Sequence, residues 1–345
     1  MVINLKLFLP SLCLAFLACA QPAEKNKIEV TAQNSADSIA LAKKLAEEAK
    51  KIIPKTAADI TLSKSFLYDQ HTLEDSYPYQ KKTRVFQMDK IKEKLAWIEN
   101  FQQEKKNYAV LQNYKNKNRE APLVKSYHRD AYTRISDSLN TERYQSAPLY
   151  LLGETKTPTI YGRDGSLVQL LSSDTIDMVR FAGISLDGEW EVPKRYVKTI
   201  GDSVTFYKVV IVDVTNQNIM TLERESPGKW LIRSMNPATT GRHNPPYAQE
   251  TPVGTFVLQE KKSKMFYYGD GTTTIEGYAP YANRFTNGAY IHGVPVNNPQ
   301  GAIVEYSWSL GTTPRSHMCV RNASSHAKHV YNWTKTFNAL FVVID

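Results

Sequence analysis

Cysteine is scarce in this chain of 345 residues, which contains only three. Cys13 and Cys19 lie in an apolar N-terminal segment, so Cys319 is the only cysteine expected in the globular part. A lone thiol has no partner for an intramolecular disulfide, and one sulfur cannot build a cysteine-rich zinc site. Two interpretations of Cys319 remain, a reactive nucleophile and a buried, unreactive side chain.

Long apolar runs are also missing. The longest extends from Leu7 to Ala20 and is interrupted by Pro10, which is too short for a comfortable membrane span but typical of an export signal. Residues 16–19 read Phe-Leu-Ala-Cys and resemble a lipobox, which predicts cleavage before Cys19 and a lipid on that residue. The alternative is plain secretion with cleavage before Gln21. Residues 1–20 are therefore expected to be a leader, and the protein is expected in the cell envelope, anchored by a lipid or else periplasmic or secreted.

The composition predicts an exported globular protein of more than one domain. A chain of this length with 42% hydrophobic residues exceeds a usual single core. Its formal net charge of +9 suits polyanions, and an exported chain meets anionic cell-wall polymers first. We therefore expect no nucleic-acid partner.

A thiol needs help to become a nucleophile, because it is mostly protonated at neutral pH. His292 and His317 are the nearby bases that could take its proton. Residues 322–333 carry capping side chains followed by apolar residues at helical spacing, which predicts a helix just after Cys319. The N-terminus of that helix would favour the thiolate and supply N–H groups near a developing oxyanion.

Several motifs from Phe206 onward give this thiol a context. In chain order they are an apolar hairpin at 210–219, Thr-Thr-Gly at 239–241, Thr-Pro-Val-Gly-Thr-Phe at 251–256, Arg-Phe at 284–285, Tyr-Ile-His-Gly at 290–293, Ser-His-Met-Cys-Val-Arg at 316–321, and an apolar run at 341–344. Together they resemble the L,D-transpeptidase (YkuD-type) catalytic domain, which we expect over residues 203–345.

The resemblance implies roles for the residues around the thiol. Cys319 would attack the peptidoglycan stem peptide and His292 would be the base, with the Gly293 carbonyl fixing its tautomer. The backbone N–H groups of Met318 and Cys319 would bind the oxyanion, and Ser316 and His317 would shape that turn.

The resemblance also implies a substrate-binding set made of Arg321, Tyr290 and Arg284, in which the Arg321 guanidinium would bind a substrate carboxylate. An internal ion pair is the alternative for Arg321. No metal or organic cofactor is required. His326 and His329 are interpreted as solvent-facing histidines rather than metal ligands.

Two residues depart from the family pattern. Met318 stands where members typically carry glycine before the nucleophile, and Asn322 follows the arginine where an apolar residue is usual. A glycine position with positive φ would strain methionine. We expect instead an ordinary backbone at residue 318 that tolerates a side chain.

Ahead of the catalytic region we expect two further parts. Residues 21–147 are predicted to be a tether and a helical region, with helices over 39–53 and 88–101. Residues 148–200 contain short β-rich runs separated by glycine-containing turns and loosely resemble an SH3-like module. The predicted fold is a mainly β catalytic domain, a β-sandwich like that of L,D-transpeptidases, preceded by a helical region and a small β module.

The sequence thus predicts an L,D-transpeptidase that forms 3-3 cross-links between peptidoglycan stem peptides through a Cys319 thioester. Two alternatives stay open. An L,D-carboxypeptidase would use the same residues with water as the acceptor. A catalytically weak, cell-wall-binding lipoprotein is the alternative outside enzymes, and Met318 is the argument for it.

Overall fold

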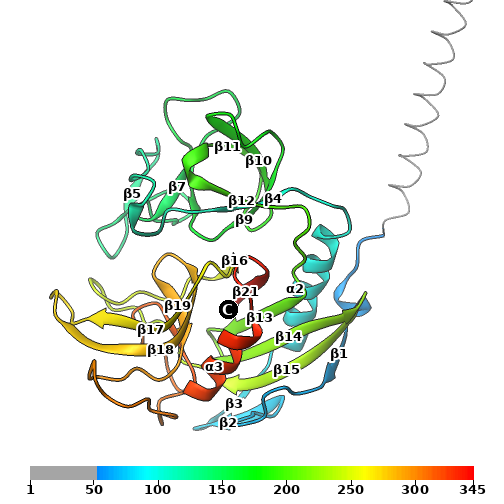
Figure 1. Ribbon diagram of the computed structural model, residues 1–345, viewed down its shortest axis with the longest axis vertical. Helices are drawn as coiled ribbons and strands as arrows, with labels where there is room; N and C mark the ends of the chain where they lie inside the picture. The colour runs from blue at the N-terminus through cyan, green and yellow to red at the C-terminus, as the bar shows by residue number, and fades with distance from the viewer. Residues whose placement is uncertain (1–52) are drawn as a thin grey trace, which may run out of the picture. The chain divides into compact units, whose positions relative to one another are not determined.

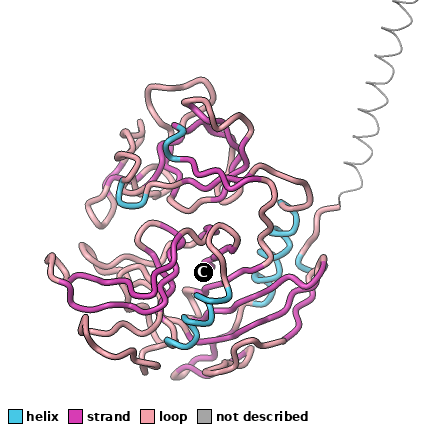
Figure 2. The backbone as a smooth tube through the Cα atoms, in the orientation of Figure 1, coloured by secondary structure: helices cyan, strands magenta, loops and turns pink. Residues whose placement is uncertain are grey.

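The computed structural model describes residues 53–345. The leader at 1–20, the lipidation candidate Cys19, the tether and the first expected helix, from Ile39 onward, lie outside these residues. Strands and loops make up most of the described chain, and helix is confined to a few short segments (Figure 2). The prediction of a mainly β protein is confirmed.

A six-stranded mixed sheet forms the centre of the catalytic region (Figure 1). Its order is β1–β15–β14–β13–β21–β16, with β1 parallel to β15 and β13 parallel to β21. The strands are β1 (Thr61–Lys64), β13 (Lys208–Asp213), β14 (Asn218–Ser226), β15 (Lys229–Pro237), β16 (Gly254–Val257) and β21 (Ala339–Ile344). The predicted hairpin is β13 and β14, whose turn is held by backbone N–H groups of residues 215 and 216 on Asp213.

Both faces of this sheet are buried, which explains its continuous apolar runs. Side chains alternate along a strand, so Val209 and Ile211 of β13 enter one hydrophobic cluster while Val210 and Val212 enter another. Helix α2 (Met88–Phe101) covers the first face with the apolar stripe that its sequence predicted. On the second face lie helix α3 (Ser324–Trp333) and parts of a four-stranded sheet.

The four-stranded sheet carries the residues singled out in the sequence. Its order is β17–β18–β19–β20, and its last pair is parallel. The strands are β17 (Glu260–Tyr268), β18 (Ile275–Thr286), β19 (Ala289–His292) and β20 (Val320–Arg321). The register pairs His292 with Arg321 across β19 and β20. Cys319 and His292 are thus brought together by neighbouring strands that are far apart in sequence.

A five-stranded antiparallel sheet lies outside the catalytic region, in the order β11–β10–β9–β4–β12. Its strands are β4 (Tyr108–Leu111), β9 (Leu167–Leu170), β10 (Met178–Gly183), β11 (Glu189–Pro193) and β12 (Val197–Gly201). Three two-stranded sheets complete the list: β2 (Ser76–Tyr79) with β3 (Lys82–Val85), β5 (His128–Arg129) with β6 (Ile135–Ser136), and β7 (Ser146–Leu149) with β8 (Ile160–Arg163). The 3-10 helices are η1 (Ala57–Asp59), η2 (Tyr114–Asn116) and η3 (Lys194–Tyr196).

The structure differs from the predicted organisation ahead of the catalytic region. Within residues 53–147, α2 is the only α-helix, and the rest is mostly strand and loop. Strand β4 inserts between β9 and β12, so the β module draws on residues well before the expected boundary at 148. Long-range strand pairing of this kind leaves no local periodicity to read. The SH3-like assignment of 148–200 stays a prediction.

Candidate functional site

The Cys319 thiol is partly exposed and lies beside the start of β19. Its Sγ donates a hydrogen bond to the Gly288 carbonyl at 3.6 Å. Burial raises the pKa of the Cys319 thiol, and the Tyr290 backbone N–H and the Arg321 charge act in the opposite direction. The thiol is therefore protonated at neutral pH and would require a base in order to act as a nucleophile.

His292 meets the requirements of that base. It ends β19, is buried, and its Nδ1 lies 2.6 Å from the Gly293 carbonyl. A carbonyl only accepts, so Nδ1 carries the proton and Nε2 has a free lone pair. Burial lowers the pKa of His292 to about 4, opposed by the Gly293 hydrogen bond and assisted by the Arg321 charge. The imidazole is neutral at pH 7, although no hydrogen bond joins it to Cys319 within residues 53–345.

The turn before Cys319 is held by hydroxyl groups. Ser316 donates its hydroxyl hydrogen to the Cys319 carbonyl and accepts from the Met318 N–H at 3.4 Å. Thr251 donates to the Met318 carbonyl at 2.8 Å and accepts the Gly241 N–H at 2.8 Å. Because the Met318 N–H points at Ser316, it is not a free oxyanion donor, and that expectation is corrected.

Glycine at position 241 is explained by the same turn. A Cβ there would lie 2.8 Å from the Met318 Cα and 2.3 Å from the Gln249 carbonyl oxygen. Such contacts are too short for any side chain. The Thr-Thr-Gly element thus lets one loop run directly against the backbone of the nucleophile's loop.

Met318 has a φ of +135°, so the expectation of an ordinary backbone at this position was wrong. Its side chain is buried in the cluster that includes Phe256 and Val320, and this packing holds the residue in a conformation that suits glycine. The sequence alone does not show whether the backbone at residue 318 is ordinary or is held at a positive φ by the packing of the side chain.

A pair of variants separates strain from packing at Met318. Met318→Ala and Met318→Gly both remove the buried side chain, but only glycine relieves the backbone. We expect Met318→Gly to exceed Met318→Ala in free energy of unfolding by roughly 1 to 3 kcal/mol. Denaturant titration of both variants measures the difference. At an ordinary φ the order would be reversed, with glycine lower by about 0.4 to 1 kcal/mol.

The His317 side chain is exposed and contacts Asp270. Its Nε2 lies 2.8 Å from Asp270 Oδ1, in the connection between β17 and β18. This contact ties the nucleophile's loop to the neighbouring hairpin. His317 is thus placed as a residue that shapes the loop, and His292 remains the histidine with the properties of a base.

Helix α3 does not begin directly after the nucleophile. Strand β20 separates Cys319 from Ser324, and the N-cap residue Ala323 makes no side-chain cap. The donor that lowers the thiol pKa is the Tyr290 N–H rather than a helix terminus. The predicted helix exists, but its proposed effect on the thiol is corrected.

Arg321 lies half-buried beside the thiol without an acidic partner in the described part of the chain. Its Nε is buried and has no hydrogen-bond partner there. Burial lowers the pKa of Arg321, as do the positive charges of Arg242 and Arg315. Arg315 stacks on exposed Trp308, its guanidinium carbon 4.8 Å from the ring centroid. The internal ion pair considered for Arg321 is absent from residues 53–345, and a cluster of three arginines lines this side of the site.

Arg284 and Tyr290 are buried and bonded to other side chains of the protein, which argues against their assignment as substrate-binding residues. Arg284 Nη1 lies 2.6 Å from Asp164 Oδ2, and its Nε lies 3.4 Å from Glu260. The Tyr290 hydroxyl donates to Glu260 at 2.8 Å. These side chains thus bind one another inside the protein, although Arg284 Nε makes no hydrogen bond within residues 53–345.

His326 was expected to face solvent but is completely buried. The Asn322 amide donates to its Nδ1 at 3.1 Å, so its Nε2–H donates to the Ser234 hydroxyl at 2.8 Å. The Asn322 N–H also donates to the His292 carbonyl at 3.0 Å. Asn322 therefore connects β19, which ends at His292, to helix α3. Its spacing of four residues from His326 could have suggested this role. His329 is half-buried.

The buried histidines predict acid sensitivity. Burial lowers the pKa of His292 to about 4 and of His326 to about 3, from 6.5. Between the folded and unfolded pKa values the unfolded chain binds more protons, so stability is complete above about pH 6.5 and is lost as the pH falls, by about 1.4 kcal/mol per pH unit for each histidine. His326→Gln should reduce this slope between pH 6 and pH 4.5, measured by denaturant titration. Equal slopes in parent and variant would refute the assignment.

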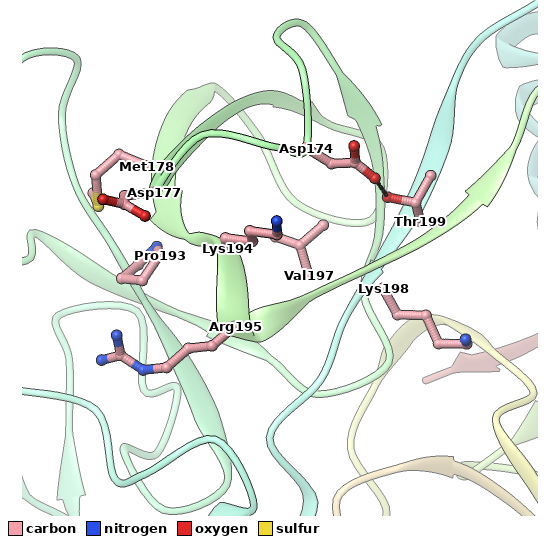
Figure 3. A pocket seen from close by; sticks show the side chains of 9 residues that line it. All are labelled: Asp174, Asp177, Met178, Pro193, Lys194, Arg195, Val197, Lys198 and Thr199. Atoms are coloured by element: carbon pink, nitrogen blue, oxygen red, sulfur yellow. Dashed lines mark hydrogen bonds between the residues drawn. The ribbon is translucent and has the colours of Figure 1, made fainter.

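A cavity lies elsewhere in the described residues, on the five-stranded sheet (Figure 3). It has a volume of about 870 Å³ and opens to solvent. Its walls come from the loop before β10 and from β10, β11, η3 and β12, and they mix both charges: Asp174, Asp177, Met178, Pro193, Lys194, Arg195, Val197, Lys198 and Thr199. Thr199 donates to Asp174 at 2.6 Å. None of the residues proposed for catalysis lines it.

No helix of residues 53–345 is both long and apolar enough to cross a membrane. The same residues contain no group of three or more histidine, cysteine or acidic side chains arranged to hold a metal ion.

Comparison with known structures finds similar proteins of low identity. An L,D-transpeptidase from Mycobacterium smegmatis is 15% identical, with 52% of this chain and 82% of that one covered and a TM-score of 0.33. One from Mycobacterium tuberculosis H37Rv is 17% identical, with 59% and 77% covered and a TM-score of 0.32. A fused Zn-dependent amidase/peptidase/peptidoglycan-binding domain protein from Clostridium acetobutylicum is 18% identical, with 40% of this chain covered and a TM-score of 0.29; the match spans 52% of that protein's length. No curated protein sequence matches the chain.

The sequence profile of the YkuD family, the L,D-transpeptidase catalytic domain, matches residues 207–344. This range contains every strand of the four-stranded sheet, the Cys319 loop and His292. Residues 207–344 are therefore a YkuD-type L,D-transpeptidase catalytic domain.

Proposed function

We propose that the protein acts on peptidoglycan stem peptides through a Cys319 thioester and forms 3-3 cross-links. The observation that carries the proposal is the pairing of β19 with β20, which places the thiol beside a strand that ends in a neutral, tautomer-fixed His292. A protonated thiol next to an unprotonated imidazole is the starting state for general-base activation of a nucleophile.

The first half of the reaction forms the thioester. His292 Nε2 takes the proton of the Cys319 thiol while Sγ bonds to the carbonyl carbon between the third-position diamino acid and the following D-alanine. The tetrahedral intermediate collapses as the carbon–nitrogen bond breaks, and His292 returns its proton to the departing D-alanine amine. Cys319 then holds the donor stem as a thioester, and His292 is neutral again.

The second half releases the acyl group. The side-chain amine of a neighbouring stem attacks the thioester carbonyl and gives its proton to His292, which passes it to the departing thiolate. The atoms of the new amide come only from the two stems, so no cofactor enters the balance. Water in place of the amine would give L,D-carboxypeptidase activity instead.

We assign the positive charge of Arg321 to binding of the stem peptide that becomes the thioester. A guanidinium that has no acidic partner within residues 53–345, beside two further arginines, favours a carboxylate of the stem peptide. The strained Met318 argues for the alternative of a catalytically weak wall-binding protein, because methionine replaces the family's glycine next to the nucleophile. Anchoring in the envelope through a lipid on Cys19 is part of the same proposal.

Mass spectrometry of muropeptides after incubation with the purified protein tests these alternatives. We expect dimers joined between two third-position residues. Tripeptide monomers without such dimers would assign the carboxypeptidase reaction. An unchanged muropeptide profile together with retention on sacculi would assign the binding protein.

A further inference from the structure

Two buried carboxylates from outside residues 207–344 hold the turn between β18 and β19. This Asn287-Gly288 turn starts the strand that ends at His292. Its Gly288 carbonyl is the group that accepts the hydrogen bond of the Cys319 thiol. The turn therefore contacts Cys319 at Gly288, and the next residue begins β19, the strand that ends at His292.

Asp164 is the first of these carboxylates, and its side chain is completely buried. Its Oδ2 accepts from Arg284 Nη1 at 2.6 Å and from the Asn287 N–H at 3.1 Å, and its carbonyl accepts from the Thr286 hydroxyl at 2.5 Å. Its Oδ1 accepts from the backbone N–H groups of residues 113–114 at 2.8 and 3.1 Å. One residue thus joins the loop after β4 to the end of β18.

Glu142 is the second carboxylate and is also buried. Its Oε1 accepts from Asn287 Nδ2 at 2.6 Å, and its Oε2 accepts from Arg134 Nη1 at 2.6 Å. Asn287 itself has no exposed surface and a φ of +38°, so its conformation depends on these partners. Hydrogen bonds to a carboxylate in a buried setting are among the stronger ones in proteins.

We propose that Glu142 and Asp164 are positioning residues of the Cys319 site, which fix Asn287 and thereby hold the Gly288 carbonyl and the thiol in register with His292. The inference rests on the proposed function for the reaction that it affects. Its consequence is that the region ahead of the matched domain contributes to the geometry of the active site.

The experiment compares substitutions that cut one hydrogen bond. Glu142→Ala leaves Asn287 Nδ2 without its acceptor, and we expect kcat to fall about 10-fold with KM within about two-fold of the parent, since small misplacements of reacting groups mainly reduce the chemical step. Glu142→Gln keeps an acceptor oxygen and should recover most of that loss. Asn287→Gly cuts the same bond from the other side while tolerating the positive φ, so its kcat should match that of Glu142→Ala.

A matched control is Asp137→Asn. Asp137 is also buried, but within the described residues its carboxylate accepts only from backbone N–H groups of residues 139, 141 and 161, none of them in the catalytic domain. We expect this variant to lower the melting temperature without lowering kcat per folded molecule. Equal losses of kcat in Asp137→Asn and Glu142→Ala would overturn the proposal, as would a parental kcat in Glu142→Ala.

A second readout needs no peptidoglycan. The Gly288 carbonyl accepts a hydrogen bond only from the protonated thiol, so releasing the turn should favour the thiolate and speed alkylation of Cys319 by iodoacetamide several-fold in folded Glu142→Ala and Asn287→Gly. Parental alkylation rates in both variants would refute the positioning role. A parent that alkylates normally but converts no stem peptide would refute the proposed function alone.

Discussion

Cys319→Ala is expected to abolish formation of the acyl-enzyme and with it all cross-linking. The substitution removes the only thiol of the described residues and changes the side-chain volume little, so the fold should persist. The activity of the purified variant on stem peptides should fall by on the order of 1,000-fold or more, because binding contacts alone supply only residual catalysis. Mass spectrometry of the muropeptide products measures it.

The control for this variant is its melting temperature. A value close to that of the parent assigns the loss to chemistry, since the hydrogen bonds of the thiol sulfur, to the Gly288 carbonyl and from the Tyr290 N–H, are weak ones. Cross-linking at the parental rate by a folded Cys319→Ala protein would rule out the cysteine mechanism.

His292→Ala is expected to reduce the rate of acylation by on the order of 100- to 10,000-fold, the usual contribution of a general base. The imidazole of His292 is neutral at pH 7, and because its Nδ1 donates to the Gly293 carbonyl, its Nε2 can accept the proton of the thiol. Single-turnover acylation kinetics measure the effect directly.

His317→Ala is the matched control for the base. His317 is two residues from the nucleophile, but its imidazole is exposed and engaged with Asp270. Its loss should change acylation far less than the loss of His292. The opposite ranking would reverse the two roles.

The sequence predicted the elements that local patterns specify. The apolar stripe of α2 and the two apolar runs of the β13–β14 hairpin appear as expected, because periodicity reflects which faces are buried. The pairing of Cys319 with His292 was available only through the order of motifs that resemble a known family, since the strands that join them are distant in sequence.

The sequence did not predict the features that depend on contacts between residues far apart in the chain. The φ of Met318 depends on how the loop of residue 241 and the hydroxyl of Thr251 hold its carbonyl. Arg284 was assigned to substrate, yet it pairs with Asp164, which lies in another part of the chain. Burial of a charged side chain against a distant partner leaves no signal in the local pattern of residues.

Detection of the acyl-enzyme is the measurement that tests the central claim most directly. The protein is incubated with a disaccharide-tetrapeptide donor, quenched in acid, and analysed by intact mass and by peptide mapping. We predict a mass increase equal to the donor minus its terminal D-alanine, located on the peptide that contains Cys319 and discharged when an acceptor amine is added before the quench. Product formation without that adduct, or with the adduct on another residue, would contradict the account.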